Sequence, residues 1–189
     1  MFMDPADVKK FPKSVQFLRG VNATLTRKPK IRDAFFKACK ADAQRRPTKV
    51  AEQLARNALA FGGPPRVDVV PGLLRVPVEG SVVDACGFTN EFGAVFHSGA
   101  TPFVQITSFF FDAIEDGFDP DPDRAGNRLM RTVLHELVHW VRGAANASDG
   151  ILVGSDLKEA GHVFENWAYG TSNICTDDEV WAAILSRRK

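Results

Sequence analysis

Two of the four histidines in the chain, His135 and His139, stand four residues apart with Glu136 between them, in the apolar run VLHELVHW of residues 133–140. In an α-helix, residues i and i+4 lie one above the other, so both imidazoles would project from the same face. Two imidazole nitrogens placed in this way can bind one zinc ion and supply half of a tetrahedral site. The spacing therefore predicts a zinc site with His135 and His139 as ligands.

Glu136 follows the first predicted ligand directly, so its side chain would point slightly to one side of the two imidazoles. A carboxylate in that place can take a proton from a water bound to the metal, which is the task of a general base. We therefore expect Glu136 to be catalytic and not to be a ligand. The reaction expected of such a site is the hydrolysis of peptide bonds.

A catalytic zinc site needs a third protein ligand and leaves the fourth position to water. The short continuation H-E-x-x-H-x-x-G-x-x-H is absent, because Gly143 follows His139 by four residues and residue 145 is alanine. The third ligand must therefore come from farther along the chain, and the polar segment KEAGHVFENWAYG, residues 158–170, offers suitable side chains.

Three residues of this segment, Glu159, His162 and Glu165, could be the third ligand. If the segment is helical, Gly161 and Glu165 share one stripe, and the small glycine would let this helix approach the one that carries His135. Glu165 is therefore our first choice. His162 is an alternative ligand or a group that stabilises an oxyanion, and Glu159 is an alternative ligand or else a supporting or surface residue.

Tyr169 is the only tyrosine of the chain and falls one turn after Glu165. Its hydroxyl could support a tetrahedral intermediate, so we name it as a candidate catalytic residue. Packing of the ring under the helix end is the equally weighted alternative. His97, in the run FHS, is more typical of a residue satisfied within a sheet than of a site group.

Helical periodicity and capping predict the elements that must position these residues. A helix is expected over residues 122–142, since Pro122 suits the first helical position and Arg142 complements the end. Its apolar faces should anchor it in the core, through Met130, Val133, Leu134, Leu137, Val138 and Val141. A second helix is expected over residues 155–169 and a third over residues 177–189.

The rest of the chain divides at the Gly62-Gly63-Pro64-Pro65 sequence. Residues 1–62 show amphipathic helical patterns and are predicted to be a helical extension, while residues 63–189 would form the catalytic domain, together as one compact unit. The predicted strands are 66–70, 72–78, 81–88, 92–98 and 103–111. The expected fold class is α+β with a small, mostly antiparallel sheet, and an extended substrate could pair with an edge strand within residues 95–110.

The overall charge of +1 hides an uneven distribution. Residues 1–66 hold 15 Lys and Arg against 5 Asp and Glu, whereas residues 67–189 hold 9 against 18. A basic surface of this kind could bind an anionic partner, but solvated helix faces docked beside an acidic body explain it as well. We regard nucleic acid as an unlikely partner.

Cys39, Cys86 and Cys175 are widely spaced, which indicates neither a disulfide scaffold nor a cysteine zinc site. The N-terminus lacks the apolar core of a signal peptide, and no uncharged run has the length of a membrane span. The sequence therefore predicts a protein that is cytoplasmic in the cell that makes it, with export by a specialised secretion system as a further possibility.

At HELVH the sequence resembles zincin metallopeptidases of the gluzincin type. The pattern E-x-G-x-x-F-E-x-x-x-Y-G of residues 159–170 also resembles the corresponding segment in bacterial toxin and secretion-effector metallopeptidase domains, including those of type VI secretion. The resemblance covers about residues 66–170. It implies a zincin-like fold, a zinc cofactor, a protein or peptide substrate, and a secretion-apparatus or immunity protein as partner.

Two other functions remain open from the sequence. The same site could hydrolyse the peptide bonds of peptidoglycan. Alternatively, the chain could be a non-catalytic binding module with a structural zinc and a basic N-terminal surface. An intact Glu136 and an incomplete ligand set in the neighbouring sequence favour catalysis, because closed structural sites usually have four protein ligands.

Overall fold

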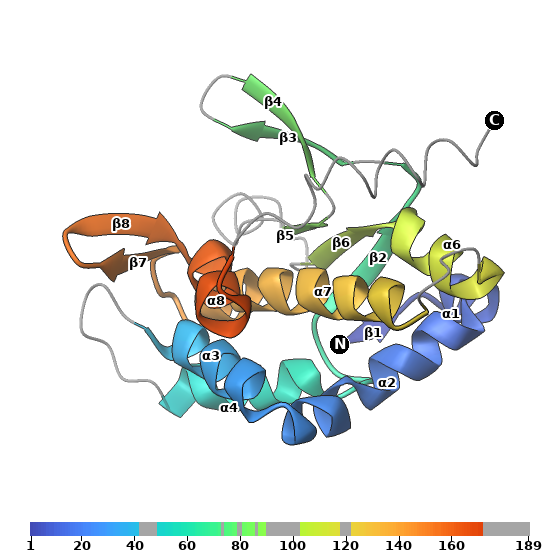
Figure 1. The fold of residues 1–189 in the computed structure, drawn as a ribbon, viewed down its shortest axis with the longest axis horizontal. Coiled ribbons are helices and arrows are strands. Elements are labelled where there is room, and N and C mark those ends of the chain that lie inside the picture. Colours follow the sequence, from blue (N-terminus) through green and yellow to red (C-terminus); the bar gives the residue numbers. More distant parts are fainter. Residues whose placement is uncertain are drawn as a thin grey trace.

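The computed structural model describes residues 1–41, 49–72, 74–78, 81–85, 87–89, 103–117 and 122–171. These residues form an α+β fold that is mostly helical, with a small central sheet (Figure 1), and the predicted fold class is confirmed. The helices are α1 (Pro5–Lys10), α2 (Pro12–Arg27), α3 (Pro29–Lys40), α4 (Lys49–Leu59), α6 (Ser108–Asp116), α7 (Pro122–Ala144) and α8 (Ala160–Tyr169). The strands are β1 (Phe2–Met3), β2 (Arg66–Val70), β3 (Leu74–Val78), β4 (Ser81–Ala85), β5 (Gly87–Thr89), β6 (Phe103–Thr107), β7 (Gly150–Val153) and β8 (Asp156–Glu159).

The central sheet has the strand order β1-β2-β6-β5. β1 pairs with β2 and β2 pairs with β6 in parallel, while β5 runs antiparallel to β6. The prediction of a mostly antiparallel sheet is therefore wrong for this sheet. In the described part of the chain, antiparallel pairing is otherwise found in two separate hairpins, β3–β4 and β7–β8. Alternating apolar residues indicate a buried face but carry no information on the direction of the neighbouring strand.

The edge strand expected within residues 95–110 is also corrected in part. Strand β6 lies between β2 and β5, so residues 103–107 are inside the sheet. Residues 95–102, including His97, lie outside the described residues. At the end of the sheet next to β6, the described edge is β5, which also packs against α7.

Two segments adopt the structure opposite to the predicted one. Residues 108–111 were expected to continue a strand, but the Thr107 side chain accepts a hydrogen bond from the Phe109 amide at 3.3 Å and begins α6. A short run of buried phenylalanines is compatible with a strand or a helix, and here the N-cap at Thr107 favours the helix. Conversely, residues 156–159 form β8 and not the start of the predicted helix, which begins at Ala160. The helix predicted over residues 177–189 and the strand over 92–98 lie outside the described residues.

Helix α7 passes through the centre of the molecule, with the sheet on one side and α3 and α4 on the other (Figure 1). Pro122 is its first residue, as predicted. The six apolar side chains expected to anchor it are at most 1% exposed: Met130, Val133, Leu134, Leu137, Val138 and Val141. The histidine-bearing helix is therefore held firmly, since burial on this scale fixes side chains in a close-packed core.

Helices α2, α3 and α4 pack on α7, and α3 also packs on α8. Phe35 of α3 meets Phe164 of α8 with ring centroids 6.1 Å apart. The fully buried guanidinium of Arg142 donates to the carbonyl oxygens of Ala38, at 2.9 Å, and of Ala41. Side chains from both sides of the predicted boundary after residue 62 thus share one core, and the division into an extension and a catalytic domain stays a prediction.

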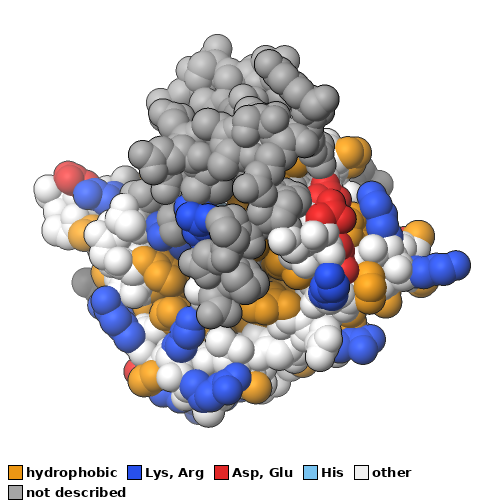
Figure 2. All heavy atoms as spheres, turned by 45° about the vertical axis from the view of Figure 1, so that its right-hand side comes forward, with side chains coloured by type: hydrophobic (Ala, Val, Ile, Leu, Met, Phe, Trp, Pro, Cys, Tyr) orange, Lys and Arg blue, Asp and Glu red, His pale blue; other side chains and the backbone are white. Residues whose placement is uncertain are grey.

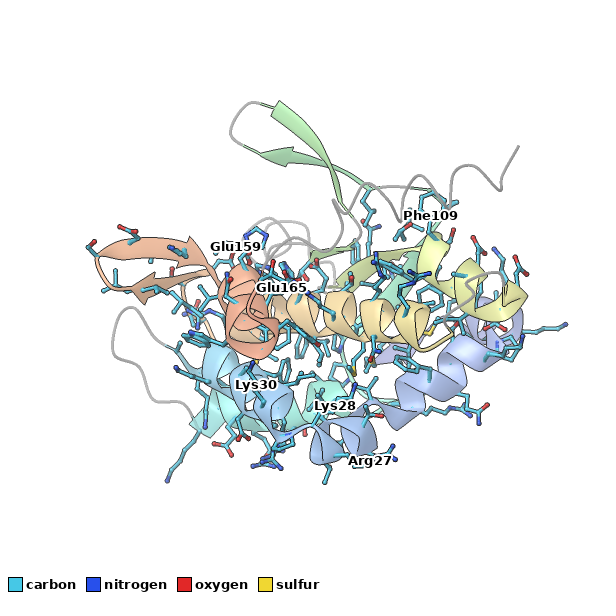
Figure 3. All side chains as sticks on the ribbon, viewed as in Figure 1. Arg27, Lys28, Lys30, Phe109, Glu159 and Glu165 are labelled. Atoms are coloured by element: carbon cyan, nitrogen blue, oxygen red, sulfur yellow. The ribbon has the colours of Figure 1, made fainter. Side chains whose placement is uncertain are left out.

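Basic side chains of the N-terminal helices are spread over the surface. On the face drawn in Figure 2, Lys and Arg side chains are scattered over the lower part, with hydrophobic and uncharged groups between them. Arg27, Lys28 and Lys30 lie at the turn from α2 to α3, on the side of α7 away from Glu159 and Glu165 (Figure 3). No helix in the described segments is long and apolar enough to span a membrane.

Candidate metal centre

His135, Glu136 and His139 all belong to α7, near its C-terminal end. The imidazole rings of the two histidines have centroids 5.0 Å apart, as expected for positions i and i+4. Both side chains are largely but not fully buried, with 16% and 17% of their surface exposed. The helix thus presents two imidazoles together at a point that solvent still reaches.

The carboxylate of Glu159 contacts both imidazoles. Its Oε1 atom lies 3.8 Å from Nε2 of His135 and 2.5 Å from Nε2 of His139. The Oε2 atom lies 2.9 Å from Nδ1 of His162. Two groups of possible metal donors result, one of His135, Glu159 and His162 and one of His139, Asp149 and Glu159. Glu159 is the member that they share.

The local structure explains why Glu159 points to the histidines. It is the last residue of β8 and the N-cap of α8, and its carboxylate accepts hydrogen bonds from the amides of Gly161, at 2.6 Å, and His162, at 2.8 Å. A carboxylate at a helix N-terminus satisfies free amide groups and interacts favourably with the helix dipole. The strand-to-helix junction therefore fixes the side chain toward α7.

Two further carboxylates contact the other nitrogen of each imidazole. Oε1 of Glu165 lies 3.1 Å from Nδ1 of His135, and Oδ1 of Asp149 lies 2.5 Å from Nδ1 of His139. Histidines that bind metals usually donate their second ring N–H to such a group, which orients the ring. The arrangement leaves Nε2 of both histidines directed to the side where Glu159 lies.

Arg131, which lies on α7 like the two histidines, contacts Glu165 of α8. Its Nη2 atom donates to Oε2 of Glu165 at 3.1 Å, and both side chains are almost completely buried. Burial by itself would raise the pKa of Glu165, but the hydrogen bonds from His135 and Arg131 outweigh it and hold the pKa below its usual value. Glu165 is therefore an ionised acceptor between a histidine and an arginine.

The same balance governs the pKa of His139 and Glu159. Burial would lower the pKa of His139, but hydrogen bonds to Asp149 and Glu159 outweigh it, so the pKa lies well above the usual value. Burial would raise the pKa of Glu159, but its bonds with His139 and His162 hold the pKa far below the usual range. In the metal-free protein, the proton on His139 thus balances the charge of Glu159, and a bound cation would take its place.

Glu136 points toward strand β5, and only 6% of its surface is exposed. The hydroxyl of Thr89 lies 2.8 Å from Oε2 of Glu136 and 2.9 Å from its backbone oxygen, so it can donate to either. An added Cβ at Gly87 would lie 2.6 Å from Oε1 of Glu136, so the strand can approach this closely only with a glycine there. Strand β5 therefore fixes the carboxylate.

The predicted close approach of α8 to α7 is confirmed at Gly161. An added Cβ at this residue would lie 2.5 Å from Cδ2 of His135, so a side chain would collide with the imidazole. Glu165, on the same stripe, also faces His135. Gly161 and Glu165, the stripe predicted from the sequence, therefore face His135.

His162 and Tyr169 occupy different surroundings. His162 is 46% exposed and its ring centroid lies 5.4 Å from that of His135, at the rim of the cluster. The contacts described for the Tyr169 ring are with Phe164, at 6.0 Å between centroids, and with the Arg131 guanidinium, 4.6 Å away. Burial raises the pKa of Tyr169 to about 12. These contacts support packing, and a catalytic role for Tyr169 stays a prediction.

Three residues of the cluster were missed in the sequence: Arg131, Asp149 and Thr89. Arg131 stands four residues before His135, so the helical spacing could have indicated it. Asp149 follows α7 in a loop, and Thr89 comes from a distant strand. Neither gives a local signal, because only the folded chain brings them to the histidines.

Comparison with known proteins identifies the family. Searches of curated proteins and of solved structures found no match. One family model, described as metallopeptidase toxin 3, matches residues 7–170, which include the whole cluster and most of the N-terminal helices. A metallopeptidase requires a metal, and the cluster of imidazole and carboxylate groups could hold one. The match confirms the resemblance to toxin metallopeptidases, and the protein belongs to the metallopeptidase toxin 3 family.

Proposed function

We propose that this protein is a zinc-dependent peptidase with a zincin-like site, in which His135, His139 and Glu159 bind the metal. The observation that carries the proposal is the position of Glu159 Oε1, within 4 Å of Nε2 of both histidines. Two imidazoles and one carboxylate are a donor set that catalytic zinc sites use, with the fourth position left to water. The contacts of Asp149 and Glu165 with the Nδ1 atoms also support metal binding by the histidines, because such contacts orient the imidazole of a metal ligand.

This assignment differs from the first choice made from the sequence, Glu165. The described contacts of Glu165 are with Nδ1 of His135 and with Arg131. A carboxylate already held by an arginine and by the Nδ1 side of a ligand is better suited to orient that ligand than to bind the metal. We therefore propose Glu159 as the third ligand and Glu165 as the residue that orients His135.

Glu136 is proposed as the general base. A bound zinc ion would lower the pKa of a water ligand and polarise the carbonyl of the scissile bond. The Thr89 hydroxyl lies within hydrogen-bonding distance of Oε2 of Glu136, and we assign Oε1 as the atom that would take the proton of the attacking water. The same oxygen then returns the proton to the nitrogen of the leaving amine. Thr89 keeps the carboxylate in one orientation during both transfers.

The family description supports action as a toxin, and we propose that the substrate is a protein or peptide of the target cell. A toxin of this kind must be delivered to its target and must be blocked in the cell that makes it. A secretion apparatus and an immunity protein are therefore the partners that this role implies.

The test is a Glu136→Gln variant. We expect it to keep its zinc content and thermal stability, because Glu136 is not a proposed ligand, and to cleave unfolded casein at least 100-fold more slowly. A His135→Ala, His139→Ala double variant should lose the metal. Casein cleavage by Glu136→Gln at the native rate would refute the mechanism, and full zinc retention by the double variant would refute the site.

A further inference from the structure

Hairpin β7–β8 exposes apolar side chains beside the candidate metal centre. Of the five large hydrophobic residues that are exposed in the described part of the chain, three lie here: Leu152 at 59%, Val153 at 37% and Leu157 at 64%. The hairpin projects from the body of the protein in Figure 1. Exposed apolar groups that gather in one place, unlike scattered ones, indicate an interaction site.

Two of these residues share a face of the hairpin with Glu159. Leu152 pairs with Leu157, and Gly150 pairs with Glu159. Because side chains alternate along a strand, these four positions lie on one face, and Val153 lies on the other. An added Cβ at Gly150 would meet the Leu157 side chain at 2.6–2.9 Å, so Leu157 lies over this glycine and between Leu152 and Glu159.

The leucine pair is also close to the proposed ligand along the strand. Leu157 precedes Glu159 by two residues, which corresponds to about 7 Å in a β-strand. An extended peptide advances by a similar distance in two residues. A substrate whose scissile bond lies at the metal centre can therefore place a side chain a few residues away against Leu152 and Leu157.

We infer that Leu152 and Leu157 form a specificity subsite that binds an apolar side chain of the substrate, within about three residues of the scissile bond. The inference rests on the proposed peptidase function. We assign the substrate as the molecule that covers these leucines, because their face of the hairpin also carries Glu159, whose carboxylate contacts both histidines. Burying one such side chain raises selectivity for it by about 10-fold or more.

The experiment compares cleavage-site profiles of zinc-loaded enzymes on a tryptic peptide mixture from a bacterial lysate, read by mass spectrometry. The native enzyme should favour Leu, Ile, Val, Met or Phe at one position near the cleaved bond. The selectivity is the ratio of kcat/KM for a peptide with Leu at that position to kcat/KM for the same peptide with Ser there. In a Leu152→Ser, Leu157→Ser variant this ratio should fall by about 10-fold. Val153→Ser removes an apolar group from the other face of the same hairpin, and Val50→Ser, 62% exposed on α4, removes one far away. Both controls should keep the native profile.

The outcomes separate the subsite from the proposed function. An apolar preference that survives in Leu152→Ser, Leu157→Ser, or that is missing from the native enzyme, would overturn the subsite alone. The absence of any cleavage that depends on Glu136 would overturn the peptidase function and the subsite with it. A third outcome would also reject the inference. In it, the double variant keeps the native cleavage profile but loses binding to phosphatidylcholine vesicles, or loses self-association, that the native protein shows. The leucines would then bind a membrane or a second copy of the chain.

Discussion

Helix α7 and hairpin β7–β8 both contribute to the candidate metal centre, but their surroundings differ. The side chains that back the histidines of α7 are almost completely buried, whereas β7–β8 is exposed over much of its length and is anchored by Ile151 and by the junction at Glu159. The helix thus holds two proposed donors in a close-packed core. The hairpin brings the proposed third donor, Glu159, from an element whose outer part is open to solvent.

In the proposed site, metal binding and substrate specificity have different structural supports. Ligands must hold their geometry, and a close-packed core provides it. A surface that selects a substrate must be accessible before the substrate arrives. A carboxylate at the base of an exposed hairpin can serve the metal while the tip of the same hairpin serves recognition.

The largest expected effect comes from removing the proposed third donor. Glu159→Gln keeps an oxygen to cap α8 but loses the charge, so we expect zinc affinity to fall by more than 100-fold. Glu165→Gln should lower zinc affinity by about 10- to 100-fold, as expected for a residue that orients a ligand. Competition with a chromogenic chelator measures both. A greater loss for Glu165→Gln than for Glu159→Gln would restore Glu165 as the ligand.

A stability comparison between the two regions should follow burial. Leu134 of α7 is fully buried, so Leu134→Ala should lower the free energy of unfolding by about 2–5 kcal/mol. Leu157→Ala, in the exposed hairpin, should change it by no more than about 0.5 kcal/mol. Urea denaturation of the metal-free proteins gives both values. A large loss for Leu157→Ala would mean that the hairpin is part of the core, and it would weaken the proposed subsite.

The smallest effect concerns pH. The folded, metal-free protein raises the pKa of His139 above its usual value of 6.5, so the folded state binds this proton more tightly than the unfolded state. That stabilisation is complete below about pH 6.5 and is lost as the pH rises through the raised pKa. The melting temperature of the chelator-treated protein should therefore decline over this range, and His139→Gln should remove that part of the decline. A metal-loaded sample should instead gain stability as the ligands lose their protons.

The sequence could identify the α7 part of the site because its geometry is local. The spacing of His135 and His139 determines their common face in any helix, and the apolar residues around them predict that helix and its burial. The same reasoning found the stripe of Gly161 and Glu165 that faces His135. The toxin metallopeptidase resemblance rested on these segments and is confirmed by the family match.

The sequence ranked Glu165 above Glu159 because the ranking assumed one helix over residues 155–169. Helical geometry places Glu159 away from the Glu165 stripe, but the residue ends β8 and caps α8, so that geometry does not apply to it. The parallel pairing of β1, β2 and β6 was missed for a similar reason. Pairing direction and the change from strand to helix depend on distant segments.

The residue types of the candidate donors, the helix that carries two of them, and the α+β class could thus be predicted from the sequence. Tertiary structure alone decided which carboxylate meets the two Nε2 atoms, that Asp149 and Glu165 hold the Nδ1 atoms, and that Thr89 holds Glu136. The physical reason is the range of the interactions. Helical spacing and capping act over a few residues, whereas hydrogen bonds between elements form only after the core has packed those elements together.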